Sequence, residues 1–122
     1  MNDETDEYPH TRIYAGTPEE PVAVDVLFPL GNIVITPAAF EAFRPLGDNY
    51  PLHHLLLRHQ AGDWGSVTEA DKRVNDRHVA TGGRLISAYV LPGGQRVWIT
   101  TDTDRSSFTT ISLPGENVRG RV

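Results

Sequence analysis

The chain has 122 residues, no cysteine and a formal net charge of −5, a size that fits one domain with a modest core. The missing cysteines exclude disulfides, cysteine zinc sites, iron–sulfur clusters and a thiol nucleophile. The N-terminus lacks the basic and apolar regions of a signal peptide, and no run approaches the roughly 20 apolar residues that span a bilayer. We therefore expect a cytoplasmic protein with no membrane partner.

The negative charge is concentrated at the N-terminus. Residues 1–20 hold six acids and one arginine, so they carry the whole net charge of −5, while the ten acids and ten bases that follow cancel. A neutral body with an acidic arm offers no basic footprint for nucleic acid. The charge distribution therefore does not indicate a nucleic-acid partner.

The first 21 residues are predicted to form a flexible acidic arm, because they are polar and hold too few apolar groups to fold. Within this arm, residues 8–14 ("YPHTRIY") have the aromatic and β-branched composition of an edge strand that lies on the body. Residues 22–114 are predicted to form a single α+β domain, and residues 115–122 a frayed tail.

The stretch "GNIVITP" predicts a short buried strand over residues 33–35. Thr36 followed by Pro37 predicts the start of a helix, because the hydroxyl can cap free amides and proline suits the first helical position. This first helix is expected to end near residue 43, since "RPLGDNYP" disfavours the helical backbone.

Two more helices are predicted next. In "PLHHLLLRHQ" the leucines recur at helical spacing, and Gly62 suits a left-handed cap at the end of this helix. A third helix is expected over residues 68–81. Its cap is either Ser66, which has capping-box spacing to Glu69, or Thr68.

Three strand-like runs, "RLISAYVL", "QRVWITT" and "SFTTISLP", follow the helices. Their short connections, "PGG" and "DTDRS", predict an antiparallel meander. With the strand at 33–35 as a further member, the element order is β-α-α-α-β-β-β. The sequence thus predicts an α+β fold with a short N-terminal strand and three helices on one face of the sheet.

Alternation with a period of two divides the meander into two faces. The aliphatic face is expected to meet the helices and comprises Ile86, Ala88, Val90, Val97, Ile99, Thr109, Ile111 and Leu113. The opposite face mixes aromatic rings, hydroxyls and a guanidinium: Ser87, Tyr89, Arg96, Trp98, Thr100, Phe108, Thr110 and Ser112. This second face either binds a foreign partner, with its aromatics as anchors, or is covered by the arm or by a second copy in a homodimer.

The segment "RHQAGDWG" (residues 58–65) has two interpretations. As a structural corner, Arg58 and His59 favour a helix C-terminus and Trp64 fills the corner before the next helix. As a site, His59 is a general acid or base and Asp63 orients it. Both interpretations stay open at this point.

The segment "DTDRS" (residues 102–106) is either a tight turn held by aspartate and serine side chains or a site where Arg105 binds an anion beside Ser106. The histidines lack the spacing of a zinc helix motif. The glycine pairs lack the spacing and the lysine of phosphate-binding loops. We expect no metal and no cofactor.

Six motifs resemble, in order, those of a family of small proteins from bacterial plasmids and integrative elements, labelled plasmid-related proteins: "GNIVITPAA", "RHQAGDWG", "DKRVN", "GGRLISAY", "VWITTDTDRS" and "TTISLP". The resemblance covers about residues 30–114 and excludes the acidic arm. It implies a mobile genetic element as the setting, without an activity or a cofactor. The family-like motifs hold more polar and aromatic residues than a bare fold needs: His59, Asp63, Trp64, Asn75, Ser87, Asp104, Arg105 and Ser106.

The first hypothesis is an interaction module that binds a host or element-encoded protein. Its binding residues are Trp64, Asn75, Ser87, Tyr89, Trp98, Asp104, Ser106 and Phe108. Association with mobile elements suggests counter-defence, such as inhibition of a CRISPR or restriction system. The alternative is a small ribonuclease that resembles barnase-like and RelE-like enzymes, with His59 as the acid or base, Asp63 orienting it and Arg105 stabilising phosphate charge. A neutral surface argues against that alternative.

Overall fold

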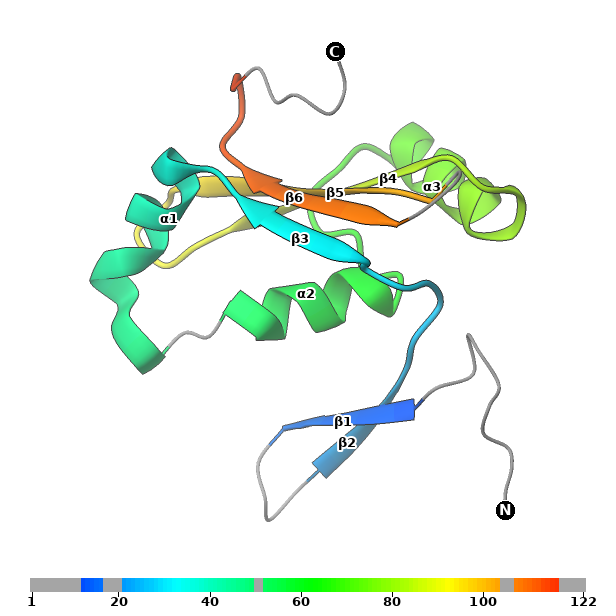
Figure 1. Cartoon of the computed structure of the whole chain (residues 1–122), viewed down its shortest axis with the longest axis horizontal. Helices are drawn as coiled ribbons and strands as arrows, with labels where there is room; N and C mark the ends of the chain where they lie inside the picture. The colour runs from blue at the N-terminus through cyan, green and yellow to red at the C-terminus, as the bar shows by residue number, and fades with distance from the viewer. Residues whose placement is uncertain (1–11, 17–20, 50–51, 104–106, 117–122) are drawn as a thin grey trace.

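The computed structural model describes residues 12–16, 21–49, 52–103 and 107–116 (Figure 1). The elements in chain order are β1 (Arg12–Gly16), β2 (Pro21–Asp25), β3 (Asn32–Ile35), α1 (Pro37–Phe43), the 3-10 helix η1 (Arg44–Asn49), α2 (Leu52–Gln60), α3 (Glu69–Thr81), β4 (Arg84–Val90), β5 (Arg96–Asp102) and β6 (Phe108–Ser112). Helices and strands occupy separate stretches of the domain, so the predicted α+β class is confirmed.

The main sheet has four strands in the order β3-β6-β5-β4. Strands β4, β5 and β6 form the predicted antiparallel meander. The predicted strand at 33–35 is β3, and it pairs with β6 in parallel, which makes the sheet mixed. The prediction that this strand is buried was wrong, because β3 lies at an edge of the sheet and most of its residues are exposed. The chain therefore leaves one edge of the sheet after β3, forms its helices, and returns to the opposite edge at β4 (Figure 1).

The N-terminal strands form a separate two-stranded antiparallel sheet, in which β1 pairs with β2. The sequence indicated an edge strand over residues 8–14 that lies on the body. Strand β1 begins at Arg12 and pairs with a close neighbour in sequence, which needs only a short connection. Residues 1–11 and 17–20 of the predicted arm lie outside the described residues.

Local capping chemistry sets the helix boundaries as predicted. The Thr36 hydroxyl accepts a hydrogen bond from the Ala39 amide at 3.1 Å, and Pro37 occupies the first helical position of α1. Of the two candidate caps of α3, the structure uses Thr68, whose hydroxyl accepts from the Asp71 amide at 3.0 Å.

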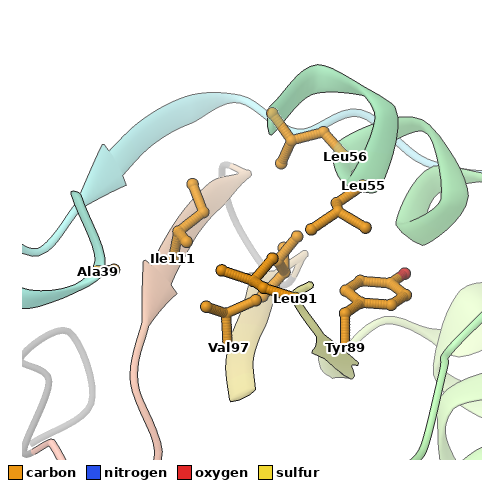
Figure 2. Close-up of a cluster of buried hydrophobic side chains, with 8 residues drawn as sticks. Ala39, Leu55, Leu56, Tyr89, Leu91, Val97 and Ile111 are labelled. Atoms are coloured by element: carbon orange, nitrogen blue, oxygen red, sulfur yellow. The ribbon is translucent and has the colours of Figure 1, made fainter. Parts of the chain in front are cut away.

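The main core lies between the sheet and helices α1 and α2 (Figures 1 and 2). It contains Ala39, Leu55, Leu56, Tyr89, Leu91, Val97, Ile99 and Ile111. A second cluster joins Phe28, Trp64 and Leu85. Helix α3 differs from the prediction of three helices on one face. It lies along the outer edge of β4, where the Asn75 side chain bonds the main chain of Ile86.

The predicted faces are confirmed for β5 and β6 and wrong for β4. Register pairs Tyr89 with Val97 and Ser87 with Ile99, so Ser87 and Tyr89 face the helices and are buried. The open face of β4 carries instead Ile86, Ala88 and Val90. The odd-numbered residues, which include Leu85 and, just after the strand, Leu91, are also apolar. Either set of alternate residues could therefore face a core. The odd-numbered residues face the core because Ser87 and Tyr89 find hydrogen-bond partners there, the His59 ring and the Asp63 carbonyl.

Candidate functional site

His59, in the last turn of α2, is completely buried and bonded through both ring nitrogens. Its Nδ1 lies 2.6 Å from the Ser87 hydroxyl, and its Nε2 lies 3.0 Å from the Thr101 hydroxyl. The Phe28 and Trp64 rings meet the imidazole edge to face, with centroids 5.1 Å and 5.7 Å away. The imidazole is therefore surrounded by two hydroxyl groups and two aromatic rings.

The hydroxyls around His59 form a directional chain that fixes its tautomer. The Thr109 hydroxyl donates to the Leu30 carbonyl at 2.7 Å, so it must accept from Thr101, whose hydroxyl lies 2.7 Å away. The Thr101 oxygen then accepts from Nε2–H of His59, and Nδ1 accepts from Ser87. The ring is neutral in this arrangement, and burial lowers the pKa of His59 to about 3.

Asp63 does not orient His59, so that part of the sequence hypothesis was wrong. Its carboxylate accepts hydrogen bonds from the Arg58 guanidinium at 2.7 Å and 3.3 Å. This bond is the main cause that lowers the pKa of Asp63 below its usual value. A carboxylate so placed at the surface pairs with the nearest cation, whereas the imidazole finds hydroxyls inside. A neutral, buried His59 has no surface from which to exchange a proton with a substrate.

The segment 58–65 is a corner that is fastened to β4. The main chain of Trp64 accepts from the Ala88 amide at 3.1 Å, and the Ser66 amide donates to the Ala88 carbonyl at 2.8 Å. The buried Trp64 ring donates through Nε1 to Asp76 at 3.0 Å. These bonds give Trp64 a structural role and explain why an indole stands between two helices.

Tyr89 fastens the same corner from the core side. Its hydroxyl donates to the Asp63 carbonyl at 2.6 Å, and the Arg58 guanidinium lies 4.6 Å from the centroid of the Tyr89 ring. Burial raises the pKa of this phenol. The sequence placed Tyr89 on the binding face, but Tyr89 is buried and stabilises the corner.

Asn75 acts as a substitute strand partner for the outer edge of β4. Its side-chain amide donates to the Ile86 carbonyl at 2.8 Å and its carbonyl accepts from the Ile86 amide at 3.0 Å. One residue pair further, Nδ1 of His78 donates to the Arg84 carbonyl at 2.7 Å. Together with the Trp64 corner, these bonds pair the Arg84 carbonyl and the outward main-chain groups of Ile86 and Ala88.

The open face of the sheet holds the exposed aromatic and aliphatic side chains that remain. Trp98 is 39% exposed and Val90 is 53% exposed, and they are diagonal neighbours on β5 and β4. Phe108, half-buried on β6, lies on the same face. We name Val90, Trp98 and Phe108 the open-face patch. Sequence reasoning found its two aromatics and missed Val90, which only the register of β4 assigns to this face.

Charge at this face is confined to its margins. The Arg84 guanidinium donates to the Asp102 carboxylate at 3.1 Å, and Arg96 is exposed beside Val90. Arg105 and Ser106, the candidate anion-binding residues, and Asp104, a candidate residue for binding a protein, lie outside the described residues. The centre of the open face is therefore uncharged: Trp98 and Val90 are apolar neighbours, Thr100 and Thr110 follow along the strands, and Phe108 lies beside Asp102.

An opening of about 270 Å³ lies elsewhere, at the end of α3, and is lined by Leu27, Phe28, Pro29, His78, Val79, Gly82 and Thr103. His59 does not line it. Among the described residues, no three histidine or acidic side chains gather as a metal would require. Nor does the described part of the chain contain a helix long and apolar enough to cross a bilayer.

Neither the environment of His59 nor the open-face patch can be interpreted by analogy with a known protein. No protein-family model, curated protein or solved structure matches the chain.

Proposed function

We propose that the protein is an interaction module that binds a protein partner through the open-face patch. The observation that carries this proposal is the 39% exposure of Trp98 in the interior of a sheet face that no described helix covers. Tryptophan is among the residues that contribute most binding energy at protein interfaces, especially where neighbouring side chains exclude water around it. Val90, the diagonal neighbour of Trp98 on β4, is placed to do so.

The electrostatics of the patch favour a protein partner over a polyanion. Its centre is uncharged, and the nearby charges are the Arg84–Asp102 pair and Arg96 at the margin. An apolar centre with a polar rim is the usual anatomy of a protein interface. A nucleic-acid surface would need a stripe of unpaired basic residues, and the net charge of the chain is −5.

The resemblance to plasmid-related proteins supports the cellular setting within this proposal. In that setting the partner is a host protein or a protein encoded by the same element. Counter-defence, by occupying a surface of a host CRISPR or restriction component, is the role that we attach to the module. The apolar side chains of Trp98 and Val90, without a charge between them, indicate that the partner presents an apolar or aromatic surface of its own.

Capture of a tagged protein from bacterial lysate, with and without nuclease, tests the proposal. Trp98→Ala should weaken capture about 30-fold, as loss of an interface hot spot of about 2 kcal/mol does. Phe40→Ala is the matched control, because Phe40 is an exposed aromatic on α1, away from the sheet face. A partner that binds Trp98→Ala as tightly as wild type, or that disappears with nuclease, would contradict the proposal.

The ribonuclease alternative has little geometric support. An acid–base histidine must reach the proton that it transfers, and His59 is completely buried with both nitrogens engaged. A purified protein that cleaves RNA and loses this activity in His59→Gln, with its fold retained, would reverse this preference.

A further inference from the structure

The two edges of the main sheet, β4 and β3, differ in whether their outward main-chain groups are hydrogen-bonded. Along β4, side chains from α3 and the Trp64 corner bond the Arg84 carbonyl and both main-chain groups of Ile86 and Ala88. Along β3, the Asn32 amide donates to Ser107 at 3.3 Å and the Thr36 amide donates to Ile111 at 3.0 Å, both toward β6. Because successive residues of a strand point their main-chain groups to opposite sides, those of Ile33 and Ile35 point away from β6. In the described part of the chain, no hydrogen bond reaches them.

The side chains of β3 are exposed on both sides of this edge. Ile33 is 48% exposed on the face that α2 covers further in, and Val34 is 44% exposed on the open face. A helix or a globular surface laid on one face would cover only one of them. A further strand added to the edge would cover both, because its own side chains alternate in the same way.

Strand β3 also lacks the features that keep edge strands apart. Its sequence, "NIVI", holds no charged residue and no proline, and these are the usual protections against edge-to-edge pairing. Pairing of this strand with its own copy therefore brings no like charges together. The same uncharged edge gives no basis for selecting a charged peptide.

We propose that β3 pairs with β3 of a second copy of the chain, antiparallel, with the two-fold axis at Val34. The free groups belong to Ile33 and Ile35, which flank Val34 symmetrically. Ile33 of each copy then exchanges both main-chain hydrogen bonds with Ile35 of the other, and the two Val34 side chains meet as a non-hydrogen-bonded pair. The two four-stranded sheets become one continuous sheet.

This dimer is independent of the protein partner proposed for the open-face patch, because it uses β3 and the opposite edge of the sheet from Val90. It brings the two open faces side by side on one surface. The strand has only 4 residues, which places the interface at the small end of the range and predicts a dissociation constant in the micromolar range or above.

Single-cysteine variants test the register directly, because the natural chain has no cysteine. In a non-hydrogen-bonded antiparallel pair the Cα atoms are about 4.5 Å apart, within the range that a disulfide spans. With oxidised glutathione as the oxidant, Val34→Cys should cross-link at least about tenfold faster than Val90→Cys, the exposed valine at the other edge. Equal rates for the two variants would overturn the proposal.

Oligomeric state provides the second measurement. Wild type should sediment as a dimer toward about 1 mM protein, and Val34→Lys should shift the dimerisation constant by at least about tenfold through like-charge repulsion. Val90→Lys is the control and should dimerise as wild type does, with circular dichroism used to verify the fold of both variants. A wild type that is monomeric over the whole range, or a Val34→Lys dimer of undiminished affinity, would refute the pairing.

Discussion

Acidification is expected to destabilise this protein through His59. Burial lowers the pKa of the ring from 6.5 to about 3 in the folded state, so at intermediate pH the unfolded chain binds a proton that the folded chain does not. A lowered histidine pKa therefore means that its contribution to stability is complete above about pH 6.5 and is lost progressively as the pH falls toward about 3.

The magnitude follows from proton linkage. Each pH unit inside that window removes about 1.4 kcal/mol from the free energy of unfolding. Between about pH 7.5 and about pH 5 the predicted loss is about 2 kcal/mol. Domains of this kind have a total stability of about 5–15 kcal/mol, so the loss is readily measured by urea denaturation.

The matched variant is His59→Gln, whose amide can bond the Thr101 hydroxyl but does not titrate. Its absolute stability is expected to be lower, because one ring nitrogen and part of the ring volume are lost. The informative quantity is the stability difference between wild type and variant, which should narrow by about 2 kcal/mol between about pH 7.5 and about pH 5. Asp63 scarcely contributes in this range, since Arg58 lowers its pKa and its contribution is lost only at lower pH.

Parallel stability curves for wild type and His59→Gln would refute the reasoning, because they would mean that the folded protein protonates His59 as easily as the unfolded chain. Asp63→Asn provides the second control. Because Asp63 bonds Arg58 and not the imidazole, this variant should keep the wild-type dependence on pH. Nitrogen-15 NMR of the ring should in addition show a neutral tautomer with its proton on Nε2.

Two further substitutions test how β4 is held. Asn75→Ala should lower the free energy of unfolding by about 2–3 kcal/mol in urea titrations, because both main-chain groups of Ile86 lose their partner. Gly65→Ala should cost more than about 3 kcal/mol, since a Cβ there would lie 1.9 Å from the Ala88 carbonyl oxygen. Gly93→Ala, also at positive φ but with no atom within 4 Å, should cost only about 1 kcal/mol, and equal losses would show that the corner is not fastened to β4.

Helix boundaries were predictable from the sequence because their causes are local. A hydroxyl that caps free amides, a proline that tolerates only the first helical turn and a glycine that adopts a left-handed conformation act within a few residues. Thr36, Pro37 and Gly62 take these roles in the structure. The choice of Thr68 over Ser66 as the cap of α3 was open locally, and Ser66 is instead drawn to the Ala88 carbonyl of a distant strand.

The face of β4 could not be predicted in the same way. In "RLISAYVL" both sets of alternate residues contain enough apolar side chains to face a core, so hydrophobicity alone does not select one. Tertiary hydrogen bonds do: Ser87 reaches His59, and Tyr89 reaches the Asp63 carbonyl. Both partners are more than twenty residues away in the sequence. Hydrophobic periodicity describes neighbouring residues only, so it cannot predict such pairs.

The residues that most resembled a binding or catalytic set in the sequence are, in the described part of the chain, mainly internal. His59, Ser87 and Tyr89 satisfy one another and the chain inside the core, and Asn75 replaces a strand. Their polarity is required because buried donors and acceptors must be paired.

The two surfaces for which we propose binding, the open-face patch and the edge at β3, consist largely of apolar side chains. A sequence pattern does not distinguish such side chains from residues of the core. In this chain α1 and α2 pack on one face of the sheet, and α3 bonds the edge of β4. Trp98 therefore stays 39% exposed, although burying it within the chain would stabilise the fold. The edge at β3 differs, because its outward main-chain groups can bond water and also offer a template for pairing with another strand. The partner that we propose would cover the apolar surface of Trp98, and the second copy that we propose would replace water on the main-chain groups of β3.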